Sequence, residues 1–300
     1  MKNKTLKRLN YYFPLLLILF TLSSFQNDDG KPKRDTVQTS GFKIKTIVVD
    51  AGHGGHDPGA FGSHSNEKTV TLALALKLQK AIEKDLKDVN VIMTRTDDNF
   101  IELHRRSDIA NKNQGQLFIS LHCNSLAGRR VTEVTGYKKG KKGKKIPIYK
   151  TVSVPNRSGK GAMILVYGSR RVGAQEEALR ENAVIYAEKD YKDNYAGYDP
   201  ENPASVILLN TFRDKYRKQS IRLATLIDNE FTDTDGRVSA GVKEQVVLVL
   251  DHTAMPAVLV ETGFINNPDD EAYLTSEEGQ NEIVASVLQA IKNYKKQVEN

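Results

Sequence analysis

The stretch that decides the fold is IVVDAGHGGHDPGA, residues 47–60, in which a short apolar run leads directly into a glycine-rich turn. The apolar residues predict a buried strand over residues 45–51. Gly52, Gly54 and Gly55 allow the backbone to turn sharply after that strand. We therefore expect His53 to be held at the carboxyl end of a strand, where open α/β sheets form their functional clefts.

Apolar runs and helical periodicity alternate along the rest of the chain, which is typical of a sheet covered by helices. The predicted strands are residues 45–51, 89–95, 116–124, 161–169, 246–250 and 256–263, and the predicted helices are residues 67–86, 101–113, 174–191, 204–231 and 276–297. Residues 126–160 are rich in Gly, Lys and Ser and interrupt this alternation, as does a loop at 195–203. We interpret 126–160 as a Lys/Gly-rich, mostly irregular loop insertion in one α/β domain.

Polar residues follow three of the predicted strands. His53, His122 and Glu261 each end an apolar run, and Glu67 begins the helix after the first loop. A catalytic zinc is often held by two histidines and one carboxylate, and a further carboxylate can act as the general base. The pattern predicts such a site and leaves open which glutamate has which role. Asp50 or Asp57 is the expected acceptor that orients a ligand imidazole.

Other features have simpler interpretations. We expect ordinary turn or surface positions for His56, His64, His104 and His252. Cys123, the only cysteine, follows His122, and adjacent strand residues point to opposite faces, so we interpret it as a core residue rather than a nucleophile. The glycine-rich turn is a poor phosphate loop because Asp57 stands where G-x-G-x-x-G requires its last glycine.

The positive charge of the chain is concentrated in two short segments. The net charge is +7, but residues 1–25 carry four Lys or Arg and no acid, and residues 138–145 carry six lysines, which leaves −3 elsewhere. This distribution excludes a broad nucleic-acid-binding face, so no nucleic acid partner is expected. The lysine-rich segment is interpreted as a solvated loop, with docking to an acidic polymer or a membrane surface as the alternative.

The N-terminus is interpreted as an export signal. Residues 1–25 combine a basic start with an apolar run at 11–20, too short to span a membrane comfortably, and residues 26–43 are a polar linker. We expect the signal to be cleaved. The alternative is a retained anchor, which would then be the expected membrane contact.

Four separated motifs carry a family resemblance: IVVDAGHGGHDPGA, SNEKTVTLALAL, LFISLHCNS and the segment that runs from GVKEQ to EAYL. Together they resemble the zinc-dependent N-acetylmuramoyl-L-alanine amidases of the Amidase_3 type. The resemblance implies a catalytic domain over 44–297, with a mixed, mostly parallel sheet and helices on both faces. It also implies Zn²⁺ bound by His53, Glu67 and His122, with Glu261 as the catalytic residue and Asn124 and Arg106 in support.

The implied reaction is hydrolysis of the amide between N-acetylmuramic acid and L-alanine in peptidoglycan. The segment RENAVI (180–185) with the helix after it resembles the insertion of periplasmic division amidases, in which a helix blocks the zinc cleft until an activator protein displaces it. The resemblance thus implies a regulatory helical insertion at 174–213, a periplasmic location and a role in daughter-cell separation. The candidate autoinhibitory residues are Glu176, Glu177, Glu181 and Glu188, and the sequence does not choose among them.

Two rival functions use the same residues. A zinc peptidase that cuts within the stem peptide would need only a different substrate pocket. A non-catalytic peptidoglycan-binding protein is the other alternative, and Glu261 argues against it because binding requires no base beside a metal.

Overall fold

The computed structural model describes residues 42–168, 175–188 and 203–300, with the side chains of 187 and 203–215 excepted. Three expected segments lie wholly or mostly outside these residues: the signal peptide (1–25), the linker (26–43) and the loop at 195–203. No helix within the described ranges is both long enough and apolar enough to cross a membrane.

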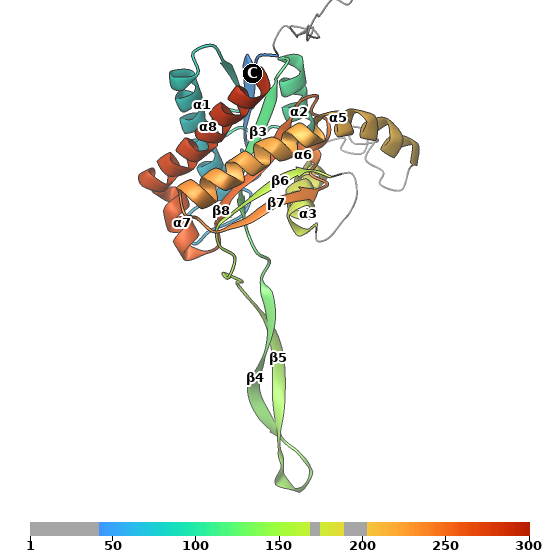
Figure 1. Cartoon of the computed structure of the whole chain (residues 1–300). Coiled ribbons are helices and arrows are strands. Elements are labelled where there is room, and N and C mark those ends of the chain that lie inside the picture. Colours follow the sequence, from blue (N-terminus) through green and yellow to red (C-terminus); the bar gives the residue numbers. More distant parts are fainter. Residues whose placement is uncertain (1–41, 169–174, 189–202) are drawn as a thin grey trace, which may run out of the picture. The chain divides into compact units, whose positions relative to one another are not determined.

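A six-stranded sheet forms the centre of the described unit (Figure 1). Its strands, in spatial order, are β2 (Asn90–Met93), β1 (Thr46–Ala51), β3 (Leu117–Asn124), β8 (Ala257–Phe264), β6 (Ala162–Tyr167) and β7 (Ser239–Gln245). All neighbouring pairs are parallel except β6 with β8. The expectation of a mixed, mostly parallel sheet is confirmed.

Helices cover both faces of this sheet. One face packs against the long helices α1 (Glu67–Asp85), α5 (Pro203–Asn229) and α8 (Glu277–Glu299), as Figure 1 shows. The other packs against the shorter α2 (Leu103–Lys112), α3 (Glu176–Asn182) and α6 (Leu248–Asp251). Successive side chains of a strand point to opposite faces of the sheet. Val49 and Ile119 therefore enter the first core, and Val48 and Phe118 enter the second.

The same alternation positions the polar residues. Asp50, Ser120, His122 and Glu261 each lie two or four residues after a member of the second core on the same strand, so they share its face, under α2 and α3. Cys123 points to the first core, as predicted, where it is fully buried. The α1 helix begins with Asn66 as its cap, whose side chain accepts a hydrogen bond from the Thr69 N–H, and this fixes Glu67 at the first helical position.

Three predicted elements are wrong. Residues 126–160 are not mostly irregular, because β4 (Arg129–Lys139) and β5 (Lys145–Val154) form an antiparallel hairpin around the short turn η1 (Lys141–Gly143). Its β-branched and aromatic residues favour strands, and the lysines obscure that pattern in the sequence. Residues 246 and 247 link β7 to α6, and residues 248–250 belong to α6 rather than to a strand, since a short apolar run does not distinguish a buried helical segment from a strand. The expected helix at 174–191 is the shorter α3, followed by a 3₁₀ turn, η2 (Ala183–Ala187).

The remaining short elements are η3 (Glu230–Thr234), which continues α5, and α7 (Pro268–Thr275), which links β8 to α8. Asn267 caps α7 by accepting hydrogen bonds from the N–H groups of Asp269 and Asp270. Glu271, on α7, accepts hydrogen bonds from the backbone N–H groups of Ser63, His64 and Ser65. The β1–α1 loop is therefore tied to the helix that follows β8.

Candidate metal centre

The backbone of the loop that carries His53 is held in place by hydrogen bonds from Arg106. Arg106 is almost fully buried and donates to the carbonyl oxygens of Ala51 (2.7 Å) and His53 (2.8 Å), and it pairs with Asp50 (2.9 Å). Burial alone would raise the pKa of Asp50, but Arg106 and two hydroxyl donors outweigh it and hold that pKa below its usual value. Arg106 thus lies on the side of the loop away from the cluster and holds the loop backbone in place.

His53 itself has a left-handed backbone, with φ of 59°. This conformation directs its ring toward β3, and its Nδ1 lies 2.7 Å from Asp57 Oδ2. Of the two acceptors considered from the sequence, Asp57 is therefore the one beside His53, whereas Asp50 contacts Arg106, Ser120 and Thr94. Asp57 on Nδ1 leaves Nε2 facing inward.

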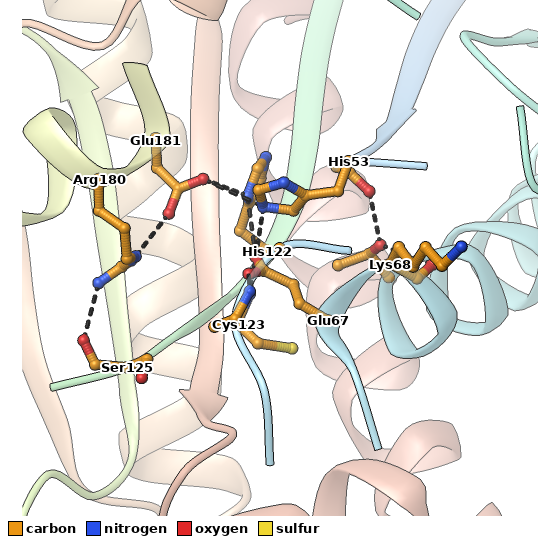
Figure 2. Close-up of polar contacts among 12 residues, drawn as sticks. His53, Glu67, Lys68, His122, Cys123, Ser125, Arg180 and Glu181 are labelled. Atoms are coloured by element: carbon orange, nitrogen blue, oxygen red, sulfur yellow. Dashed lines mark hydrogen bonds and ion pairs between the residues drawn. The ribbon is translucent and has the colours of Figure 1, made fainter. Parts of the chain in front are cut away.

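Four side chains converge on one point (Figure 2). His53 Nε2 lies 3.0 Å from Glu67 Oε1 and 3.3 Å from Glu181 Oε2. His122 Nδ1 lies 3.0 Å from the same Glu67 oxygen and 2.8 Å from the same Glu181 oxygen. These four atoms all lie within 4.8 Å of one another, in a buried setting. Glu67 and both histidines meet as predicted, and Glu181 is the addition.

The cluster fits a tetrahedral zinc ion. Four donors at zinc-ligand distance from a common centre lie roughly 3.4 Å apart, close to the separations here. His53 Nε2 and Glu181 Oε2 are buried and make no well-formed hydrogen bond in the described residues, although they approach each other, the Glu67 carboxylate and His122 Nδ1 closely. Buried polar atoms of this kind need a partner, and a bound cation would supply it.

The surroundings of Glu67 favour the ionised form of its carboxyl group. Its Oε2 accepts a hydrogen bond from the Ala60 N–H and its Oε1 from the Cys123 N–H, both at 2.8 Å. Burial would raise the pKa of Glu67, but His53 and His122 more than offset that effect and lower it to about 2. A carboxylate that stays ionised is the form that binds a metal.

Glu261 lies beside the cluster on β8, opposite His122 in the strand register, and is fully buried. It does not end its strand, as the sequence pattern suggested, because β8 continues to Phe264. The β3–β8 register shifts between His122 and Asn124, an irregularity of the kind that redirects side chains at active sites. Burial raises the pKa of Glu261 to about 8, even though Arg180 beside it acts in the opposite direction.

Comparison with known proteins gives this site its context. A profile of the Amidase_3 family, described as N-acetylmuramoyl-L-alanine amidase, matches residues 47–293. The chain belongs to the Amidase_3 family of N-acetylmuramoyl-L-alanine amidases. The match confirms the expected enzyme class, a hydrolase of peptidoglycan, and favours the amidase over a peptidase or a non-catalytic binder.

Individual relatives agree with the family. The chain is 26% identical over 269 residues to the amidase AmiA of Escherichia coli K12, covering 89% of this chain and 81% of AmiA. It is 28% identical over 251 residues to AmiC of Escherichia coli O6:H1, covering 83% and 52% of the two chains. The crystal structure of an amidase from Clostridium difficile 630 has the same fold, with a TM-score of 0.56, 21% identity and coverage of 85% and 98%.

The four glutamates considered for autoinhibition have different surroundings in the amidase. Only Glu181 reaches the metal cluster. Glu188 accepts a hydrogen bond from the Leu103 N–H at the start of α2 (2.9 Å), and Glu177 accepts one from Gln245. Glu176 is exposed. The structure therefore brings one of the four together with the predicted ligands.

Sequence reasoning missed Arg180 and Asn182, the neighbours of Glu181. Arg180 donates to Glu261 Oε1 and to Asn124 Oδ1, each at 2.8 Å, and Figure 2 shows it beside Glu181. Asn182 anchors the segment through hydrogen bonds to the Val246 carbonyl and the Leu248 N–H. The signal is present in the motif RENAVI (180–185), in which Arg180 and Asn182 flank the candidate Glu181.

The α3–η2 segment lies against the metal cluster. The space left at the cluster is a cavity of about 10 Å³, room for about one water molecule. Its lining includes His53, His122 and Glu181, together with Asn182 and Val184 of the α3–η2 segment. Asn124, expected to support the site, is buried here, and its Nδ2 has no hydrogen-bond partner in the described residues.

Gly52 permits the close approach of the two histidines. A Cβ at this position would lie 2.5 Å from the His122 ring, whose centroid is 4.8 Å from that of His53. We predict that Gly52→Ala displaces His122 and weakens zinc binding by about 10–100-fold, as other changes around metal ligands do. Competition with a fluorescent zinc chelator measures this loss. The control is Gly136→Ala, where an added Cβ meets nothing within 4 Å; equal zinc affinity in the two variants would contradict the prediction.

Proposed function

We propose that this amidase binds one zinc ion through His53, Glu67 and His122, and that it hydrolyses the amide between the lactyl group of N-acetylmuramic acid and L-alanine. The observation that carries the proposal is the convergence of these buried donors, with unpartnered atoms, next to the buried carboxylate of Glu261. When bound, zinc supplies Lewis-acid polarisation of the scissile carbonyl and activation of a water molecule.

Glu261 is the residue that we propose for both proton transfers of this reaction. Glu261 Oε2 has no hydrogen-bond partner in the described residues, so it is available to accept a proton from the attacking water. The same carboxyl group then returns that proton to the departing alanine nitrogen. Asn124 Nδ2 is equally without a partner among those residues and can donate to a substrate carbonyl once Arg180 has left.

We further propose that the contacts of α3 autoinhibit the amidase. Glu181 Oε2 lies 3.3 Å from His53 Nε2 and 2.8 Å from His122 Nδ1, so it would occupy the fourth ligand position of a bound zinc ion, which catalysis requires for water or substrate. Arg180 engages Glu261, and the cavity that the α3–η2 segment helps to line is, at about 10 Å³, too small for a glycan strand. Release requires displacement of α3, and an activator protein is the proposed agent. A related amidase fold, CwlD of Clostridioides difficile, has been solved in complex with the GerS lipoprotein.

The cellular setting follows from the same resemblance. An N-terminal export signal and a regulatory insertion at 174–213 support a periplasmic enzyme that acts in daughter-cell separation. Both segments lie partly or wholly outside the described residues, so support for this role rests on their sequence and on the contacts of α3.

Mass spectrometry of digested peptidoglycan tests the proposed reaction. Purified sacculi are treated with the zinc-loaded full chain and, in parallel, with the Arg180→Ala/Glu181→Ala variant, in which the block is removed. We expect intact stem peptides with a free N-terminal alanine, together with glycan strands that lack peptides. Shortened stems still attached to glycan would instead identify a peptidase, and absence of products from both samples would contradict the proposal.

A further inference from the structure

The β4–β5 hairpin has no role in the chemistry described above, and its surface is unusual. Among the described residues, ten large hydrophobic side chains are exposed, and five of them lie on this hairpin. They are Val134 (48% exposed), Tyr137 (63%), Ile146 (40%), Ile148 (44%) and Tyr149 (63%). A two-stranded hairpin is at best marginally stable alone in water, so a surface that covers these side chains would stabilise it.

The hairpin also concentrates positive charge. Nine Lys or Arg residues and a single carboxylate, Glu133, lie between Arg129 and Val154, a net charge of +8. The whole chain carries +7, so the remainder of the protein is close to neutral. Six of the nine are the lysines of residues 138–145, at and beside the turn η1. The hairpin is drawn in Figure 1 as a two-stranded ribbon separate from the central sheet.

The strand register separates two faces. Paired residues share a face, so Val134, Tyr149, Tyr137 and Pro147 lie together, with Lys139 and Lys145 beside them toward the turn. The opposite face holds Glu133 with Lys150, and Ile148 and Ile146 farther along. The first face, which we call the tyrosine face, therefore combines aromatic and apolar side chains with cations and contains no acid.

We propose that the hairpin docks, through its tyrosine face and turn lysines, on the surface of an anionic phospholipid bilayer. Lysines are attracted to anionic headgroups, and tyrosines favour the boundary between headgroups and acyl chains. A soluble polyanion would neutralise the lysines but leave the exposed Val134, Tyr137 and Tyr149 of the tyrosine face in water, which argues for lipid as the occupant. This contact is distinct from the one expected at residues 1–25 and does not depend on the proposed reaction.

Because the chain contains no tryptophan, the fluorescence of a single introduced tryptophan reports only on the surroundings of that position. Tyr149→Trp places one fluorophore on the tyrosine face of the full chain, and Phe61→Trp places one at a position of equal exposure (63%) on the β1–α1 loop. Vesicles of phosphatidylcholine alone, or mixed equally with phosphatidylglycerol, are then added. For the Tyr149→Trp variant we expect a blue shift of the emission, and quenching by brominated lipid, only with phosphatidylglycerol. For the Phe61→Trp variant we expect no change with either kind of vesicle.

Variants of the lysines, made in the Tyr149→Trp background, test whether electrostatic attraction to anionic lipid drives the docking. Replacing the six lysines of 138–145 with Gln should abolish the fluorescence response, whereas replacing all six with Arg should preserve it; circular dichroism verifies that both variants fold. An unchanged spectrum of the Tyr149→Trp variant with phosphatidylglycerol vesicles would overturn the proposal. So would an equal response to phosphatidylcholine, or a response to purified peptidoglycan in place of lipid.

Discussion

Replacing Glu261 with Gln is expected to reduce amidase activity about 100–10,000-fold while the zinc content of the protein stays unchanged. The substitution keeps the shape of the side chain but removes the group that accepts and returns a proton, and general acid–base catalysis contributes about that factor. The measurement is the rate of release of free stem peptides from peptidoglycan, made in the Arg180→Ala/Glu181→Ala background so that the cleft is open. Zinc content is measured on the same samples by inductively coupled plasma mass spectrometry.

Glu67→Gln is the matched control for this experiment. It makes the same chemical change at a residue whose carboxylate oxygen lies 3.0 Å from both histidines. We expect this variant to lose zinc as well as activity. If Glu261→Gln also lost zinc, Glu261 would be a ligand and the division of roles between the two glutamates would be wrong.

Replacing Arg180 and Glu181 together with Ala is expected to raise the basal activity of the amidase at least about tenfold, which corresponds to about 1.4 kcal/mol of released inhibition. The pair makes contacts with both histidines and with Glu261. Their loss opens the fourth position at the metal and frees the base. The measurement is the initial rate with purified peptidoglycan and no added partner protein.

Glu176→Ala is the matched control, because Glu176 lies on the same helix but is exposed. It should leave the basal rate unchanged. A double variant that folds and binds zinc, yet is no faster than the parent chain, would show that α3 does not limit access. A double variant that loses activity would mean that Arg180 or Glu181 takes part in catalysis.

Much of the fold could be predicted because its core strands are short, apolar and followed by recognisable turns. The β1–β3 part illustrates this: strands at 45–51 and 116–124 and the capped helix between them appear close to their predicted limits. The hairpin could not be predicted because its stability comes from pairing between Arg129–Lys139 and Lys145–Val154, which composition does not reveal. The prediction for 246–250 failed because apolar residues alone fit a short buried helix, here α6, as well as a strand.

The metal cluster could be predicted to a similar extent. That His53, His122 and two glutamates meet follows from the rule that polar residues at the carboxyl ends of parallel strands lie at one edge, whereas the choice of Glu67 as the ligand comes from the family resemblance. Glu181 could only be counted among four candidates, since its position depends on how a short helix packs across the sheet through Asn182 and Gln245. Arg180 was not predicted at all, because its partner Glu261 lies 81 residues away in the sequence.

Anomalous X-ray diffraction at the zinc absorption edge, from crystals of the zinc-loaded full chain, tests the central claim most directly. The claim is that zinc binds between β1, α1 and β3 and that the insertion supplies its fourth ligand. We predict a single strong peak surrounded by His53 Nε2, Glu67 Oε1, His122 Nδ1 and Glu181 Oε2. A peak elsewhere, or no peak from zinc-loaded crystals, would contradict the account. A peak whose ligands exclude Glu181 would leave the enzyme assignment intact but contradict the proposed autoinhibition.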